Sequence, residues 1–186
     1  MKKLDVRKIT LSSMLLALLI VSALISIPVP FLAIKITLQT MILFILASLL
    51  SPLYSFITVF LYIAMGLIGL PVFSAGGGIM YILAPSFGFL AAFLVASPLM
   101  SAIQRMKFSN ALMRYIIACF VGILIIYVIG VPYLYYILKI YMGKNISFSY
   151  ALIYGGLMFL PFDILKAAAA YPIVSNKYIK KLVSSK

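Results

Sequence analysis

Residues 151–174 read ALIYGGLMFLPFDILKAAAAYPIV, a long apolar run that carries one aspartate and one lysine near its middle. An apolar run of ~17–25 residues is long enough to cross the hydrocarbon core of a bilayer as a helix. Charged side chains are costly at that depth and usually face the protein interior. The stretch therefore predicts a transmembrane helix on which Asp163 and Lys166 face an interior site.

The composition of the whole chain indicates an integral membrane protein. Hydrophobic residues make up 66% and charged residues 9% of the 186 residues, and the mean hydropathy is +1.26. A soluble domain carries roughly 25% charged residues, so this chain lacks the polar side chains needed to cover a surface in water. The apolar runs do not alternate in polarity as the strands of a membrane β-barrel do. Helices are therefore the expected spanning elements.

Five more apolar runs precede this one, separated by short polar or proline-containing segments. We expect an all-α integral membrane fold, with six transmembrane helices in one bundle and an outer glycine-rich loop over the ligand site. The first run follows a basic stretch, as in a signal peptide, but it is longer than a signal core and no small-residue cleavage site follows it. We expect a single membrane domain, residues 1–186, with spans at about 9–27, 36–50, 53–69, 83–103, 112–138 and 151–174.

The formal net charge of +13 is concentrated outside the apolar runs. Both termini and the loop between the fourth and fifth spans are rich in lysine and arginine, and such segments stay on the cytoplasmic side of a membrane. We therefore expect a multi-pass protein with both termini cytoplasmic and the glycine-rich loop outside. No basic stripe is interleaved with aromatic residues, so the expected partner of this charge is the lipid bilayer and not nucleic acid. The basic residues in these segments are Lys2, Lys3, Arg7, Lys8, Arg105, Lys107, Arg114, Lys177, Lys180, Lys181 and Lys186.

Asp163 is the sole carboxylate expected within the membrane, because the other acidic residue, Asp5, lies in the basic N-terminal tail. Lys166 follows Asp163 by three positions, which places both side chains on one face of a helix. One interpretation is a neutralising pair that only holds helices together. The interpretation that we favour is a binding site, in which a solute offers hydrogen-bond donors to Asp163 and an anionic end to Lys166.

The segment 73–78 reads FSAGGG and is the expected outer loop. Glycine permits positive φ angles and a close approach of the backbone, so the loop is a candidate to cover or contact a ligand. The alternative is a flexible external hairpin. The loop lacks the Gly-Lys-Ser/Thr ending of a phosphate-binding loop, as does the rest of the chain, so ATP binding is not expected. The candidate ligand contacts in and beside the loop are Phe73, Gly76, Gly77, Gly78 and Tyr81.

Thr37 and Gln39 form a polar patch where the second span begins. They are either ligand contacts on the outer side or an ordinary polar helix start. The chain has one cysteine and no histidine, which excludes an internal disulfide and removes the commonest metal ligand and general base. We therefore expect no metal, no cofactor and no catalytic residue, in a protein that is not an enzyme.

Small residues recur at every fourth position in two spans. Ser13 and Ala17 do so in the first, and Gly88, Ala92 and Ala96 do so in the fourth. Such ladders let helix backbones approach closely in lipid. We expect the fourth-span set to pack within the protein, whereas the first-span pair is also a candidate face for another membrane subunit.

Several stretches, in this order, resemble one protein family. They are residues 36–39 (ITLQ), 61–73 (LYIAMGLIGLPVF), 76–78 (GGG) with Tyr81, 85–89 (PSFGF) and 161–167 (PFDILKA). Together they resemble the biotin-specific BioY family, the substrate-capturing S components of energy-coupling-factor (ECF) vitamin transporters. The chain differs at Lys35, Phe162 and Phe89, where that family often has proline, glycine and tyrosine.

The resemblance implies the substrate-capture subunit of an ECF-type ABC importer, which binds biotin with high affinity for uptake across the bacterial cytoplasmic membrane. The implied partners are a transmembrane coupling subunit, which would meet the face of Ser13 and Ala17, and two ATP-binding subunits. The late motif implies ligand contacts for Asp163 and Lys166. The alternatives are an S component for another vitamin, thiamin or riboflavin, and a membrane assembly subunit that binds no ligand.

Overall fold

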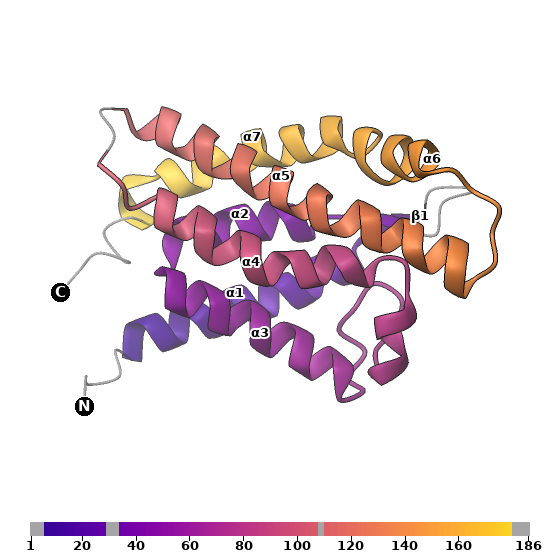
Figure 1. The fold of residues 1–186 in the computed structure, drawn as a ribbon. Coiled ribbons are helices and arrows are strands. Elements are labelled where there is room, and N and C mark those ends of the chain that lie inside the picture. The colour runs from indigo at the N-terminus through magenta and orange to yellow at the C-terminus, as the bar shows by residue number, and fades with distance from the viewer. Residues whose placement is uncertain (1–5, 29–33, 108–109, 180–186) are drawn as a thin grey trace.

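The computed structural model describes residues 6–28, 34–107 and 110–179. Within these ranges the chain forms a bundle of helices that run roughly along one direction (Figure 1). Some of the charged residues that we expect on the cytoplasmic side lie outside the described residues. These are Lys2, Lys3, Asp5, Lys180, Lys181 and Lys186. The helices and strands are α1 (Val6–Leu24), β1 (Ser26–Pro28), β2 (Lys35–Thr37), α2 (Gln39–Leu49), α3 (Pro52–Leu67), η1 (Ile79–Leu83), α4 (Phe87–Ile103), α5 (Ala111–Tyr136), η2 (Ile137–Tyr141), α6 (Phe148–Leu152), η3 (Ile153–Leu157) and α7 (Leu160–Ser175).

Three continuous helical stretches are long and apolar enough to cross a bilayer by length and composition. These stretches are Val6–Leu24, Ala111–Tyr141 and Phe148–Ser175, and the shorter apolar helices are α2, α3 and α4. Helix α2 has 11 residues. At about 1.5 Å per residue it covers about 16 Å, roughly half of a hydrocarbon core. The predicted span 36–50 begins too early as a helix, because Lys35–Thr37 form β2 and α2 starts at Gln39.

A short two-stranded antiparallel sheet, which we did not predict, adds to the helices. Strand β1 pairs with β2 in the register Ser26↔Thr37, Ile27↔Ile36 and Pro28↔Lys35. The isoleucine and threonine side chains here favour extended backbone, and proline removes a backbone donor and so ends the preceding helix. The first predicted span, 9–27, is therefore wrong at its end, because α1 stops at Leu24.

The fourth predicted span, 83–103, begins too early. Residues Ile79–Leu83 form the separate 3-10 helix η1, and Ala84 is extended with φ −76° and ψ 138°. Ala84 precedes Pro85 in the sequence, and the residue before a proline is pushed out of the helical region. Helix α4 consequently starts at Phe87.

The last predicted span, 151–174, is a composite of helical segments. Helix α6 continues into the π-helical segment η3, a turn follows, and α7 starts at Leu160 with Pro161 in its first turn. Proline is tolerated there because a first-turn N–H has no partner within the helix. Asp163 also lies in the first turn of α7, where the helix dipole favours a negative charge.

Helix α4 packs most extensively against α5. Gly88, Ala92 and Ala96 are buried in α4, as the small-residue pattern predicted. A side chain at Gly88 would overlap the ring of Tyr133 on α5. Close backbone approach therefore fixes the two helices that form one wall of the bundle.

The bundle has two distinct ends (Figure 1). Helix α1 begins and α7 ends at one end, where α4 also ends and α5 begins. The β1–β2 hairpin, η1 and α6 lie at the opposite end. We call this opposite end the hairpin end.

Candidate functional site

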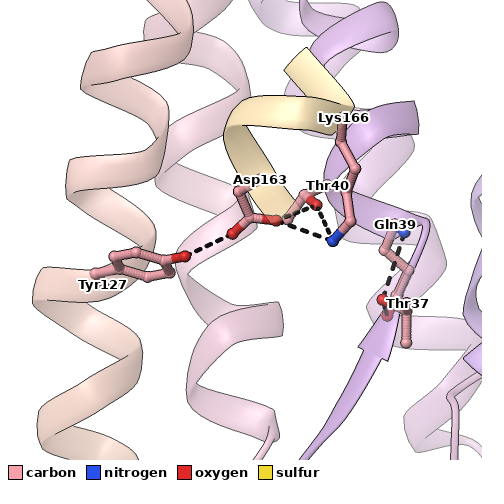
Figure 2. A network of polar contacts seen from close by, with 6 residues as sticks. All are labelled: Thr37, Gln39, Thr40, Tyr127, Asp163 and Lys166. Carbon is pink, nitrogen blue, oxygen red and sulfur yellow. Dashed lines mark hydrogen bonds and ion pairs between the residues drawn. The ribbon is translucent and has the colours of Figure 1, made fainter. Parts of the chain in front are cut away.

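The carboxylate of Asp163 is the centre of a polar network between three helices (Figure 2). Its Oδ1 accepts hydrogen bonds from Thr40 Oγ1 on α2, at 2.8 Å, and from Lys166 Nζ on α7, at 2.9 Å. Its Oδ2 accepts one from the hydroxyl of Tyr127 on α5, at 2.7 Å. Asp163 is only 4% exposed, so these donors replace the water that the carboxylate loses.

Lys166 is neutralised within the same network. Its Nζ lies 2.9 Å from Asp163 Oδ1 and donates a second hydrogen bond to Thr40 Oγ1 at 3.1 Å. Removing one partner of a buried ion pair leaves an uncompensated charge at high cost. The spacing of residues 163 and 166 predicted that both side chains share one helix face, and in the structure they form an ion pair whose two charges cancel. The ion pair belongs to the interpretation that we did not favour, and a ligand contact of either residue stays a prediction.

A second polar chain holds Gln39 at the start of α2. Thr37 Oγ1 donates to Gln39 Oε1 at 3.1 Å, and Gln39 Nε2 donates to the hydroxyl of Tyr62 at 2.8 Å. Tyr62 in turn donates to the carbonyl of Val72 at 3.1 Å. The chain of hydrogen bonds fixes the amide so that Oε1 keeps one free acceptor position, since an amide oxygen has two lone pairs.

Side chains of the Asp163 network and of the Gln39 hydrogen-bond chain line one cavity towards the hairpin end. It is open at its mouth, and its empty space, with the open solvent there included, is about 620 Å³. Polar side chains from several elements face an apolar wall of α4 and α5. The lining residues are Ile34, Lys35, Thr37, Gln39, Thr40, Ser74, Tyr81, Ser86, Phe89, Leu90, Phe93, Ile126, Tyr127, Gly155, Phe159, Asp163 and Lys166.

The loop before η1 contributes Ser74 to the cavity, and η1 itself contributes Tyr81. The Tyr81 hydroxyl lies 3.4 Å from Ser74 Oγ and 3.2 Å from Ser86 Oγ. Lys35 Nζ on β2 donates to the backbone carbonyl of Ser74 at 2.7 Å. The loop and the hairpin therefore meet at the rim of the cavity.

The remaining candidates in the loop, Phe73 and the glycines, contribute to the shape of the loop. Phe73 is 1% exposed, with its ring centroid 5.3 Å from that of Tyr62 and 4.5 Å from that of Tyr81. Gly76 and Gly78 have φ angles of 108° and 107°, which favour glycine.

Within the described ranges, neither Phe73 nor any of Gly76, Gly77 and Gly78 belongs to the lining of the cavity. Gly77 lies against the backbone carbonyl of Leu70, so a Cβ there would overlap it. A direct ligand contact of these four residues stays a prediction.

Ser13 and Ala17 lie elsewhere, on an exposed face of α1. Ser13 Oγ donates to the carbonyl of Ile9 at 3.0 Å within the helix. This pair does not pack inside the protein, which leaves the subunit-docking interpretation as a prediction. Within the described ranges, no cluster of three or more His, Cys, Asp or Glu side chains occurs, so no residues are assigned as metal ligands.

Sequence reasoning missed Thr40 and Tyr127. Thr40 follows Gln39 in the same polar patch, and Tyr127 is a hydroxyl-bearing residue in the middle of an apolar run. Both were detectable as polar groups expected in the membrane, where every such group needs a partner. Lys35 was noted only as a difference from the resembling family.

Comparisons with known proteins agree with one another. A family model described as the BioY family matches residues 1–184. A protein named "Probable biotin transporter BioY" from Lysinibacillus sphaericus is 33% identical over 178 residues, which cover 96% of this chain and 90% of that protein. "Biotin transporter BioY" from Thermotoga maritima is 31% identical over 180 residues, covering 95% of this chain and 97% of the relative.

A solved structure is also similar. It is described as the S-component for biotin from an ECF-type ABC transporter, and it matches with a TM-score of 0.79 at 30% identity. The match covers 91% of this chain and 89% of that one.

Proposed function

Because the chain belongs to the BioY family, we propose that it is the biotin-capturing S component of an ECF-type ABC importer in the membrane. The observation that carries the proposal is the cavity with one buried carboxylate, Asp163, held by hydroxyl and ammonium donors. A transporter subunit of this kind is not an enzyme, and biotin is its transported substrate and not a cofactor.

The hydrogen-bonding capacity of the site supports biotin. The ureido ring of biotin offers two N–H donors and one carbonyl acceptor. Asp163 has about four acceptor positions, of which the protein uses three, and Gln39 Oε1 has one left. Lys166 has three donor positions and uses two. We therefore assign the ureido N–H groups to Asp163 and Gln39, and the ureido carbonyl to Lys166.

We propose that the six apolar helical stretches lie in the bilayer, the short α2 covering about half of its hydrocarbon core, with both termini in the cytoplasm. The distribution of charge supports this orientation. Arg7 and Lys8 start α1, and Arg105 and Lys107 follow α4, all towards the end of the bundle where α1 begins. The hairpin end has fewer basic residues, as the positive-inside bias predicts for an outer face. The cavity then opens to the outside, where biotin arrives.

We further propose the partner set of a membrane coupling subunit and two ATP-binding subunits. The sequence supports this because it lacks the Gly-Lys-Ser/Thr ending of a phosphate-binding loop. The exposed pair Ser13 and Ala17 supports α1 as the docking helix, since small residues permit close helix contact in lipid.

Equilibrium binding of labelled biotin to the purified protein tests the function. We expect saturable binding that unlabelled biotin displaces and that thiamin and riboflavin do not. Asp163→Asn keeps the shape but removes the charge, so it should weaken binding by about ten- to a hundredfold, the range for a hydrogen bond to a charged group. Ser13→Ala, outside the cavity, is the matched control and should bind as the wild type.

Displacement of biotin by thiamin or riboflavin would contradict the assignment. So would a wild-type protein that retains no biotin although its thermal unfolding transition shows that it is folded. Unchanged affinity in Asp163→Asn would leave biotin as the ligand and remove Asp163 from its site.

A further inference from the structure

Two lysines line the cavity, and only one of them has its charge neutralised by a carboxylate among the described residues. Lys166 is paired with Asp163 at 2.9 Å. It belongs to the inner network, our name for Asp163 with its donors Thr40, Tyr127 and Lys166. Lys35 donates to the uncharged carbonyl of Ser74, and among the described residues no carboxylate lies within ion-pair distance of it. The chain has two acidic residues in all, and Asp163 is the only one in the described part. The cavity therefore has net positive charge at Lys35.

The position of Lys35 separates it from the inner network. It begins β2, opposite Pro28 in the hairpin, and Thr37 follows two residues later. A strand rises about 3.3 Å per residue, so Lys35 lies about 7 Å farther along the strand than Thr37. An ammonium group has three donor positions, and Ser74 accepts from one of them. Lys35 is thus available at the rim, at the hairpin end of the site.

The two lysines are consequently unequal candidates for an anionic ligand group. A carboxylate at Lys166 would approach Asp163, which already shares that ammonium, and two like charges close together repel in a low dielectric. A carboxylate at Lys35 would meet a positive charge with no competing anion among the described residues. The apolar side chains of Phe89, Leu90 and Phe93 also line the cavity and suit a hydrocarbon tail.

We propose that Lys35 binds the valerate carboxylate of biotin at the rim of the cavity, while the ureido ring occupies the Asp163 network. This inference rests on the proposed function and reassigns the anionic end from Lys166 to Lys35. Lys35 thereby selects biotin over derivatives in which the carboxylate is masked.

The test compares biotin with biotin methyl ester in binding to the purified full-length chain. For the wild type we expect the ester to bind about fivefold more weakly, the effect of about 1 kcal/mol expected for a partly solvated ion pair. In Lys35→Met and Lys35→Gln, biotin should weaken to the affinity of the ester, and the ester itself should bind as in the wild type. Lys35→Arg should restore the preference for biotin.

Lys139→Met is the matched control, because Lys139 is an exposed lysine outside the cavity lining, and it should behave as the wild type. Unchanged ester binding by the Lys35 variants also reports that they are folded. If both Lys35 variants still prefer biotin over its ester, another group binds the carboxylate and the inference is wrong, although biotin capture stands. If the folded wild type binds neither compound, the proposed function fails and this inference fails with it.

Discussion

Asp163 is acceptable in the interior of the helix bundle because three donors reach it from three helices. Thr40, Tyr127 and Lys166 supply those hydrogen bonds, and the lysine also cancels the charge. A buried carboxylate without them would be protonated or would destabilise the fold. The same donors hold the carboxylate in one orientation, so a ligand meets a group that is already ordered.

Tyr127 is an uncharged donor that reaches Asp163 from α5. Tyr127→Phe removes only the hydroxyl that donates to Asp163 Oδ2 at 2.7 Å. We expect biotin binding to weaken by up to about tenfold, because the carboxylate loses a donor that orients it for the ligand and a hydrogen bond to a charged group contributes about 1.5 kcal/mol. Titration calorimetry of the variant measures the change.

Tyr135→Phe is the control for this variant, since Tyr135 lies on the same helix and its hydroxyl accepts from Lys139 at 2.6 Å, outside the cavity lining. If the two variants lose affinity equally, the effect comes from α5 in general and not from the Asp163 network.

At the scale of elements, the ends of the helices position the site. Helix α7 starts at Leu160 after the π-helical segment η3, so Asp163 falls in a first turn. The β1–β2 hairpin places Lys35 at the rim of the cavity, and Gln39, shortly after β2, is the first residue of α2. Helix interiors supply the rest, above all the apolar walls of α4 and α5. Binding groups thus gather where regular helices are interrupted.

Helix α1 has a separate role in our proposal, on the exposed face of Ser13 and Ala17. Ala17→Trp places a large side chain where a partner helix would approach. We expect co-purification with the coupling subunit to fall strongly, while biotin binding by the isolated chain stays unchanged. Ala169→Trp on α7, another exposed alanine, should leave the complex intact. Equal recovery of the complex with Ala17→Trp would exclude this face as the docking surface.

At the scale of the whole molecule, the distribution of basic residues supports the orientation that we propose for the protein in the membrane. Lys177 follows α7 at one end of the bundle, and Lys144 lies between α5 and α6 at the other. Both residues are exposed. Because these two exposed positions lie at opposite ends of the bundle, a single cysteine introduced at either one can report which end faces the outside.

We expect Lys144→Cys to react with a membrane-impermeant maleimide in intact cells, and Lys177→Cys to react only after permeabilisation. The native Cys119, which is buried, is replaced by alanine in both variants. The protein with Cys119→Ala and no added cysteine measures background labelling. Labelling of Lys177→Cys in intact cells would mean that the termini face outwards and that the positive-inside argument fails for this chain.

The sequence by itself determined the membrane class, the helical content and the position of Asp163 and Lys166 on one face of a helix. Each of these follows from local properties, because hydropathy over a window predicts a helix and a spacing of three residues places both side chains on one face. The hairpin of Ser26–Pro28 with Lys35–Thr37 was missed, since a strand of three residues is too short to show a period.

Only the tertiary structure decided which groups meet the carboxylate and which lysine remains uncompensated. Thr40 and Asp163 are 123 positions apart, and Tyr127 and Asp163 are 36 apart. Such contacts depend on how α2, α5 and α7 pack, and no local pattern in one sequence encodes a distance between separate helices. The same packing separates Lys35 from Asp163, which is why the rim and not the inner network carries the free positive charge.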